Sequence, residues 1–269
     1  MTAIDSGIDT LAPVAGVSVT LTDGVLAVTI DRPDSLNSVT TGVLAGIADA
    51  MEAAARDPRV RAVRLGGAGR GFSSGAGIGA EDASDELPTE IIVEANRAIR
   101  AIVALPRPVV AVVQGPAAGV GVSLALACDL IVASDKAFFL LAFTKIGLMP
   151  DGGASALVAA AVGRTRAMRL ALLAERLSAA EALEWGLVSA VYPAEEFDAE
   201  VDKLLGRLLA GPAVALSKTK HAVNAATLTE LNAALDREYV GQSILLNNHD
   251  FREGARAFQE RRSANFTDS

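Results

Sequence analysis

The sequence has very little of the material from which covalent cross-links and metal sites are made. It contains one cysteine, Cys128, and two histidines, His221 and His249, among 269 residues. One cysteine excludes a disulfide framework and a thiolate metal cage, and two histidines cannot by themselves form a zinc site of the usual His-rich kind. We therefore expect no bound metal. Cys128 is expected to be a small buried apolar residue.

The chain is also short of positive charge and of long apolar runs. It has 24 Lys and Arg against 32 Asp and Glu, a net charge of −8. This balance argues against nucleic-acid binding, because neutralising phosphates needs a basic face. The apolar stretches are too short to span a membrane, and the first fifteen residues lack the features of a signal peptide. We expect a cytoplasmic protein without a membrane or nucleic-acid partner, in which backbone amides or a local Lys/Arg cluster hold any anionic ligand.

What the sequence does contain is a globular composition, 51% hydrophobic and 21% charged, with alternating strand and helix patterns. The β-rich runs 17–22 and 25–30 flank Asp23-Gly24, a strong hairpin signal. Further strands are expected at 60–65, 108–113, 129–133 and 187–192, and helices at 41–56, 88–105 and 119–127. Such alternation predicts an α/β fold with a parallel sheet built from crossover units.

Beyond about residue 193 the pattern is helical throughout. Helices are expected at 195–210, 212–225, 228–246 and 250–262, and a capping box at Ser178 and Glu181 begins a helix before them. Several helices with apolar faces and no remaining sheet to cover need a surface to pack on. The pattern allows either a neighbouring subunit or the core of the same chain.

Three interpretations compete for the glycine-rich residues 66–80. Residues 75–80 fit a loose dinucleotide-binding fingerprint, but an acidic stretch follows where an apolar helix is required. Gly-x-Ser-x-Gly at 71–75 resembles a nucleophile elbow, with Asp151 and His249 in the order found in α/β-hydrolases. That elbow must join a strand directly to a helix, and residues 66–70 intervene. A serine hydrolase acting through Ser73 is therefore a remote alternative.

The third interpretation uses backbone groups. Glycine lets a loop approach a ligand closely and direct N–H groups at a developing negative charge. A second glycine-rich segment, 115–121, lies where a short helix begins, and amides at a helix N-terminus carry partial positive charge. Two such loops, each following a strand, could converge on one carbonyl oxygen. Spacing alone favours the simpler alternative that both are tight turns.

Five segments, in order, resemble motifs of the enoyl-CoA hydratase/isomerase (crotonase) superfamily: RPDSLNS (32–38), FSSGAGI (72–78), VQGPAAGVGVSLALACD (113–129), FTKIGLMPDGG (143–153) and EGARAFQERR (253–262). The resemblance implies a flexible tail at 1–16, a crotonase-like spiral of ββα units at 17–195, and a C-terminal helical region at 196–269. That last region would complete the CoA site and build a homotrimer or a dimer of trimers. The implied substrate is an acyl-CoA thioester, in which coenzyme A is part of the substrate and no separate cofactor is needed.

The resemblance also assigns residues to the site. It implies that the backbone N–H groups of Ser74 and Val120 bind the thioester carbonyl oxygen. It implies contacts with CoA by the backbone near Asn37 and by Ser74, Gly75, Ala76, Gly77, Ile78 and Arg261. For Arg261, a solvated helix face is the alternative that we favour.

The acidic residues in the matched motifs indicate the reaction. Hydratases of this family use two glutamates, and their positions fall on Ser123 and Phe143 here. Asp151 lies in the motif where family isomerases carry a single catalytic carboxylate, and one carboxylate can move a proton from C2 to C4 of an enoyl thioester. The alternative is that Asp151 is only a turn or cap residue for the helix after Gly153. Ser123 is expected to bond a backbone carbonyl.

These observations predict an enoyl-CoA isomerase in which Asp151 is the catalytic proton shuttle. An enoyl-CoA hydratase that lacks both usual glutamates is the nearest alternative. A catalytically inactive acyl-CoA-binding homologue is another.

Overall fold

The computed structural model describes residues 7–77 and 89–267. The larger of two sheets has the strand order β1-β2-β3-β4-β6-β9. β1 and β2 form the expected antiparallel hairpin, and every other neighbouring pair in this sheet is parallel. The strands are Val17–Thr22, Val25–Ile30, Ala62–Gly67, Val109–Val113, Leu130–Ser134 and Ala190–Tyr192. The predicted α/β fold with a parallel sheet is confirmed.

A second, smaller sheet was not predicted. It has the order β5-β7-β8 and consists of Pro116–Ala118, Phe138–Leu140 and Leu177–Ser178. Strands of two or three residues are too short to show an alternating pattern, which explains why the sequence did not reveal them. β4, β5 and α3 follow one another along the chain, so one strand of each sheet precedes a helix, as the predicted ββα units require.

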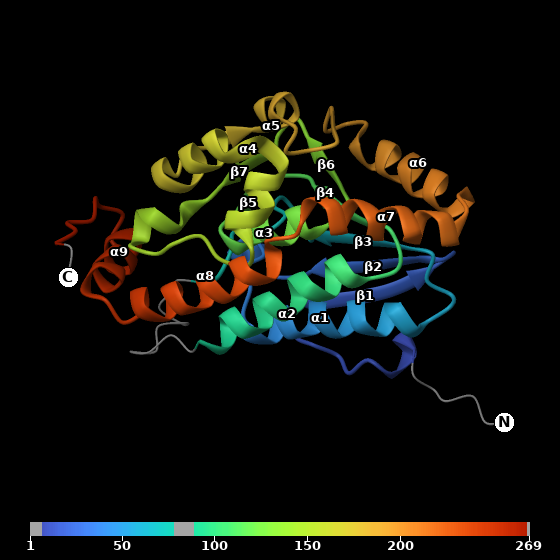
Figure 1. Ribbon diagram of the computed structural model, residues 1–269, viewed down its shortest axis with the longest axis horizontal. Coiled ribbons are helices and arrows are strands. Elements are labelled where there is room, and N and C mark those ends of the chain that lie inside the picture. Colours follow the sequence, from blue (N-terminus) through green and yellow to red (C-terminus); the bar gives the residue numbers. More distant parts are fainter. Residues whose placement is uncertain (1–6, 78–88, 268–269) are drawn as a thin grey trace.

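Two layers of helices cover the larger sheet (Figure 1). α1 and α2 lie together on one face, and α6 lies on the other. Successive side chains of a strand point to opposite faces of the sheet. In β3, Val63 and Leu65 belong to the core under α1 and α2, whereas Ala62 packs with residues of α6. The helices are α1 Thr41–Arg56, α2 Glu90–Ala104, α3 Val120–Ala127, α4 Ala154–Leu173 (bent at Gly163), α5 Ala179–Trp185, α6 Phe197–Ala210, α7 Ala213–Thr227, α8 Leu231–Leu245 and α9 His249–Gln259. None of the helices in the described ranges has the length and hydropathy needed to cross a membrane.

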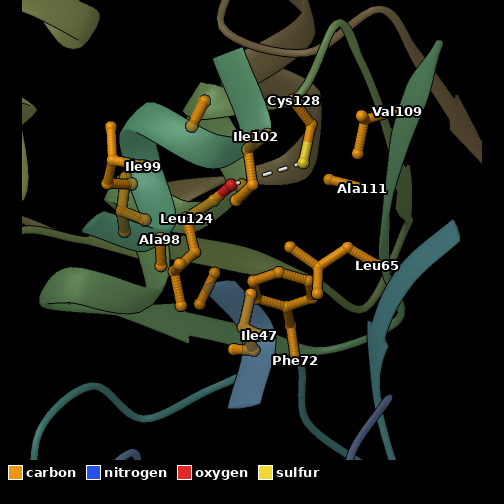
Figure 2. Close-up of a cluster of buried hydrophobic side chains, with 14 of the residues drawn as sticks. Ile47, Leu65, Phe72, Ala98, Ile99, Ile102, Val109, Ala111, Leu124 and Cys128 are labelled. Carbon is orange, nitrogen blue, oxygen red and sulfur yellow. Dashed lines mark hydrogen bonds between the residues drawn. The ribbon is translucent and has the colours of Figure 1, made fainter. Parts of the chain in front are cut away.

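The core fixes the first glycine-rich loop in place. Phe72, the residue before its two serines, is fully buried, and Figure 2 shows its ring beside Ile47 and Leu65. Burying a phenylalanine contributes about 1.5–3 kcal/mol, so this ring holds the loop against the sheet. Cys128 is buried in the same core with its Sγ 3.3 Å from the carbonyl oxygen of Leu124, which confirms that prediction.

The last two helices pack on the core of their own chain. Leu231 and Leu235 of α8 belong to the main core cluster. α9 lies so close to the short 3-10 helix Ala142–Ile146 that a Cβ on Gly254 would be 2.5 Å from the Cα of Ile146. α8 therefore packs with one face on the chain's own core, and α9 packs on the 142–146 helix of the same chain.

α7 is attached differently, because it has no buried residue. Lys220 reaches from α7 to the core, where its Nζ lies 2.9 Å from Asp129 Oδ2 and donates to the carbonyl oxygen of Ile102 at 2.9 Å. The Lys220 and Asp129 side chains are 7% and 18% exposed, so this is a nearly buried ion pair. Polar contacts hold this helix where apolar packing does not.

The N-terminal segment is less independent than expected. Ile8 is buried in the main core, and its N–H donates to Asp57 Oδ2 at 3.2 Å. Val14 packs against Gly46 of α1. The prediction of a flexible tail is therefore wrong for residues 7–16, which lie against α1 and the loop that follows it.

Candidate active site

The two glycine-rich loops meet, as the backbone interpretation required. Ser73 forms a parallel β-bridge with Ala117 of β5. Gly75 has φ +88°, and a Cβ built on it would lie 2.8 Å from the carbonyl oxygen of Ala118 and 3.3 Å from the Cα of Gly119. Only glycine can adopt this backbone conformation without strain and allow the loops to approach so closely. The loops are thus a single structural unit rather than two unrelated turns.

The hydrogen bonds of the first loop change the predicted donor. The N–H of Ser74 donates to the carbonyl oxygen of Leu36 at 2.9 Å, so it is not available to a ligand, and its assignment as an oxyanion donor is wrong. Gly75 C=O and Gly77 N–H both bond to Val39, so the N–H of Ala76 between them points away from Val39. In the described ranges this N–H has no acceptor, and Ala76 lines the cavity beside the loops.

The second predicted donor is in a suitable position. Val120 is the first residue of α3, and the N–H of a first helical residue has no acceptor within its own helix. Val120 and Gly119 line the same cavity as Ala76. The amide of Val120, at the positive end of the α3 dipole, suits a developing oxyanion. Its role stays a prediction, now paired with Ala76 rather than Ser74.

The cavity beside these amides is mainly apolar. Its walls come from both loops, from α1 and α2, from the 142–146 helix and from the C-terminal helices α8 and α9. Such walls suit an acyl chain, with a few polar groups to orient the reacting end. The apolar lining residues outside the two loops are Leu44, Ile91, Ile92, Ala95, Ala142, Phe143, Ile146, Leu148, Leu246 and Phe251.

Asp151 is the carboxylate of this cavity, and it is the one titratable side chain among the described lining residues. Its pKa is raised to about 7: removal of the carboxyl group from water has the largest effect, a hydrogen bond from Gln242 lowers the pKa, and the nearby carboxylate of Glu238 raises it by a smaller amount. Gln242 Nε2 donates to Asp151 Oδ2 at 2.8 Å. A carboxyl group with a pKa near neutrality can both accept and return a proton, as a shuttle must.

The alternative role of Asp151 as a helix cap is wrong. α4 begins at Ala154 with Gly153 as its N-cap, and the N–H groups at its start donate to the side chain of Glu238 on α8. Glu238 Oε2 accepts from the N–H of Gly153 at 2.6 Å, and Oε1 accepts from the N–H of Ser155 at 2.8 Å. Because Glu238 satisfies these amides, the Asp151 side chain is available to the cavity.

Glu238 and Gln242 were missed by the sequence analysis, although a signal was present. Both lie on α8, about 90 residues after Asp151. They continue the buried stripe of Leu231 and Leu235 at the spacing of helical turns, so they are polar residues at core positions. A polar residue on the buried stripe of a helix indicates a buried partner.

The positions of the two family glutamates carry no acid. Ser123 Oγ donates to the backbone carbonyl oxygen of Asp151 at 2.7 Å, which confirms the expectation of a bond to a backbone carbonyl. Phe143 presents an apolar side chain to the cavity. The described part of the cavity therefore lacks the paired carboxylates that hydration uses.

The serine hydrolase alternative is wrong. Ser73 is fully buried, its Oγ donates to the carbonyl oxygen of Asn37 at 2.8 Å and accepts from the N–H of Gly75 at 3.2 Å. The candidate base His249 is exposed at the start of α9, where its ring lies 3.3 Å from Thr267 Oγ1. Ser73 is a loop-bracing residue and not a nucleophile.

Asn37 also has a structural role rather than the predicted contact with CoA. It is fully buried, and its Nδ2 donates to the carbonyl oxygens of Ala68 at 2.8 Å and Gly71 at 2.7 Å. Its Oδ1 accepts from the N–H of Arg32, and its own N–H donates to the carbonyl oxygen of Arg32. With every polar group paired internally, Asn37 ties the 32–38 segment to the first glycine-rich loop.

The remaining predicted contacts divide into three groups. Ser74, Gly75, Ala76 and Gly77 line the cavity. Arg261 is exposed after α9 and is not among the lining residues. Ile78 lies outside the described residues.

Within the described ranges, His, Cys, Asp and Glu side chains form no group of three that could hold a metal ion.

Comparison with known proteins identifies the family. A family model described as enoyl-CoA hydratase/isomerase matches residues 20–269. The chain belongs to this family. The enoyl-CoA hydratase/isomerase resemblance of the five motifs is thereby confirmed.

Individual relatives differ in their described activities. A 1,2-epoxyphenylacetyl-CoA isomerase of Escherichia coli is 37% identical over 91% of this chain and 95% of its own length. A probable enoyl-CoA hydratase of Rhodobacter capsulatus is also 37% identical, over 92% and 96%. A crystal structure of an enoyl-CoA hydratase from Mycobacterium avium subsp. paratuberculosis is 72% identical with a TM-score of 0.91, covering 95% of this chain and 100% of that one. The crotonase-like fold is confirmed by this likeness.

Proposed function

We propose that this protein is an enoyl-CoA isomerase that shifts the double bond of an acyl-CoA thioester, with Asp151 as its proton shuttle. The observation that carries the proposal is the identity of the acid. Asp151 is the one carboxylate among the described lining residues, and its pKa is raised to about 7. A 1,3-proton shift needs one such group, whereas hydration by the family's usual route needs two.

The reaction follows from the positions of the amides and the acid. The thioester carbonyl oxygen accepts hydrogen bonds from the N–H groups of Ala76 and Val120, and each such donor is worth about 10²–10³ in rate. Ionised Asp151 removes a proton from C2 of a 3-enoyl thioester, and the electron pair of that C–H bond enters a dienolate whose negative charge lies on the carbonyl oxygen. The dienolate then takes the proton back from Asp151 at C4, which leaves the double bond between C2 and C3.

The rest of the substrate and the assembly complete the proposal. The cavity-lining segment from Ser74 to Gly77 contacts CoA, Arg261 stays on a solvated face outside the cavity, and no cofactor beyond the substrate is used. The chain works as a homotrimer or a dimer of trimers in the cytoplasm. Exposed apolar side chains on two C-terminal helices support self-association; among them are Val214, Val223, Val240 and Ile244.

Hydration is the second candidate, and a specific observation favours it. The 72% identical crystal structure is that of an enoyl-CoA hydratase, and one 37% identical relative is a probable hydratase. Against it, Ser123 and Phe143 occupy the positions of the two glutamates and supply no acid. The 37% identical E. coli relative is an isomerase of a different CoA thioester, 1,2-epoxyphenylacetyl-CoA, and supports isomerisation as the class of reaction.

The test offers purified protein matched 2-enoyl-CoA and 3-enoyl-CoA thioesters and separates the products by chromatography. We expect interconversion of the two isomers without 3-hydroxyacyl-CoA, and a loss of roughly 10²–10⁴-fold in Asp151→Asn. Asp236→Asn, an exposed carboxylate on α8, is the matched control and should turn over normally. Formation of 3-hydroxyacyl-CoA as the main product would establish the hydratase instead. Tight acyl-CoA binding without turnover of any thioester would instead identify the protein as a catalytically inactive acyl-CoA-binding homologue.

A further inference from the structure

We propose that Gln242 is a positioning residue that restricts the proton carried by Asp151 to a single carboxyl oxygen, Oδ1. This inference deepens the proposed isomerase and rests on it. Three hydrogen bonds between α8 and the segment before α4 support this role. Gln242 acts through Asp151 and takes no direct part in the proton transfer.

The Gln242 amide is held by three hydrogen bonds, and its residue is 1% exposed. Its Nε2 donates to the carbonyl oxygen of Met149 at 2.9 Å and to Asp151 Oδ2 at 2.8 Å. Its Oε1 accepts from the N–H of Met149 at 3.2 Å. A primary amide has two N–H donors, so the donors of Gln242 are fully used.

The backbone of Met149 also determines which way the amide points. If the side-chain amide were flipped, its NH₂ group would face the N–H of Met149. Its oxygen would then face two acceptors, the Met149 carbonyl and Asp151. That orientation would lose all three hydrogen bonds and leave buried polar groups unpaired, at a cost of about 1–3 kcal/mol each. Gln242 therefore presents a donor to Asp151 in both protonation states of the acid.

A fixed donor makes the two oxygens of Asp151 unequal. A proton on Oδ2 would face the Nε2–H of Gln242 and break that bond, so the neutral acid carries its proton on Oδ1. Oδ1 has no hydrogen-bond partner in the part of the chain that the structure describes, and Asp151 borders the cavity. One oxygen thus both removes the proton at C2 and returns it at C4, which places the two transfers on the same face of the dienolate.

The second contact of α8 supports the same geometry. Glu238, one turn before Gln242, holds the N–H groups of Gly153 and Ser155, so α8 fixes the chain on both sides of Asp151. Among the helices packed around Asp151, α8 supplies the one charged side chain that shifts its pKa, Glu238. The described cavity lining holds no titratable side chain other than Asp151 itself. Burial has the largest effect on the pKa of Asp151, and the two side chains that modify it, Gln242 and Glu238, both lie on α8.

The experiment compares Gln242→Met, which keeps the volume but removes the donor, with the wild-type protein. We expect kcat to fall about 10- to 100-fold with KM nearly unchanged, because a misplaced reacting group costs rate rather than binding. We also expect the acidic midpoint of the kcat–pH profile to rise by about one pH unit, since the lost donor favoured ionised Asp151. Ser243→Ala is the matched control: Ser243 is the next residue on α8, is half-buried, and its hydroxyl bonds only the Tyr239 carbonyl of the same helix, so the substitution should change neither quantity.

A second measurement tests the single-oxygen shuttle directly. With a substrate deuterated at C2, the wild-type protein should return part of the deuterium to C4, and Gln242→Met should return less. An unchanged pH midpoint and unchanged deuterium return in Gln242→Met would overturn the inference, even if thermal stability fell. If that variant does not fold, Gln242→Glu keeps the shape, adds a second acid, and should raise the midpoint more; an unchanged midpoint there overturns the inference as well.

These outcomes separate the inference from the function on which it rests. Full activity in Asp151→Asn would refute the isomerase itself. Loss of activity in Asp151→Asn together with a wild-type profile in Gln242→Met would refute the positioning role alone. Titration of the Asp151 carboxyl by ¹³C NMR, with Asp151→Asn to assign its signal, reports the midpoint without any turnover.

Discussion

Replacing Asp151 by asparagine should stabilise the protein at alkaline pH while removing most of its activity. The pKa of Asp151 is about 7 in the folded protein against an ordinary value of 3.8, a difference of about 3 units. Each unit corresponds to about 1.4 kcal/mol, so ionising this half-buried acid costs the folded state at most about 4 kcal/mol. Water that enters the cavity lowers this cost, so about 4 kcal/mol is an upper limit.

The sign of the effect follows from the raised pKa. Burial favours neutral Asp151, so its favourable contribution to folding is complete below pH 3.8 and is lost as the pH rises through about 7. Asparagine cannot ionise and does not suffer this loss. The free energy of unfolding of Asp151→Asn, minus that of the wild type, should therefore increase by about 1.4 kcal/mol per pH unit between pH 4 and 7 and then level off.

Urea unfolding of both proteins at a series of pH values measures this difference. Both must be compared at one protein concentration, because any association of folded subunits also shifts the apparent stability. Asp236→Asn again serves as the control and should show no such pH dependence. A difference between Asp151→Asn and wild type that stays constant from pH 4 to 8 would show that Asp151 is not a buried acid with a raised pKa.

Three further substitutions test other parts of the structure. Gly75→Ala places a Cβ 2.8 Å from the Ala118 carbonyl oxygen at a positive φ; it should cost about 1–3 kcal/mol in urea unfolding and lower turnover by separating the amides. Ser73→Ala should lower the free energy of unfolding by about 1 kcal/mol and keep thioester turnover. Complete loss of turnover with CoA affinity intact would instead support Ser73 as a nucleophile. Lys220→Met leaves Asp129 buried without its partner and should cost about 3–5 kcal/mol by thermal or urea unfolding, and adding Asp129→Asn should recover part of it; a loss below 1 kcal/mol would contradict the anchoring of α7.

Much of the fold could be predicted because its signals are local. The hairpin over β1 and β2 and the helix α1 have the bounds that the pattern predicted, since turn residues and a helix-stopping Asp-Pro delimit them. The strand starts near residues 60 and 187 were placed two or three residues early, because apolar side chains precede the first ladder hydrogen bonds. β5, β7 and β8 left no periodic signal, since strands of two or three residues cannot show one.

The site was predicted in part, and its errors have a common cause. The two glycine-rich loops and Asp151 carry chemistry in their own residue types, so motifs could find them. Which amide of the first loop is available could not be found that way, because it depends on Leu36 and Val39 as hydrogen-bond partners. The contact of Asn37 with CoA was predicted from its motif alone. The motif does not show that the polar groups of Asn37 are all paired within the chain.

The sequence by itself determined the α/β class, the family and the position of the single acid. Alternating strand and helix patterns indicate the class, the glycine-rich motifs indicate the family, and Asp151 is the acid within one of those motifs. Only the tertiary structure decided that Ala76 rather than Ser74 offers its N–H, and that Glu238 and Gln242 surround Asp151. The physical reason is that hydrogen-bond partners and burial depend on segments far apart in the chain. About 90 residues separate Asp151 from Glu238 and Gln242, and packing of α8 on α2 and α4 brings these polar groups to the acid.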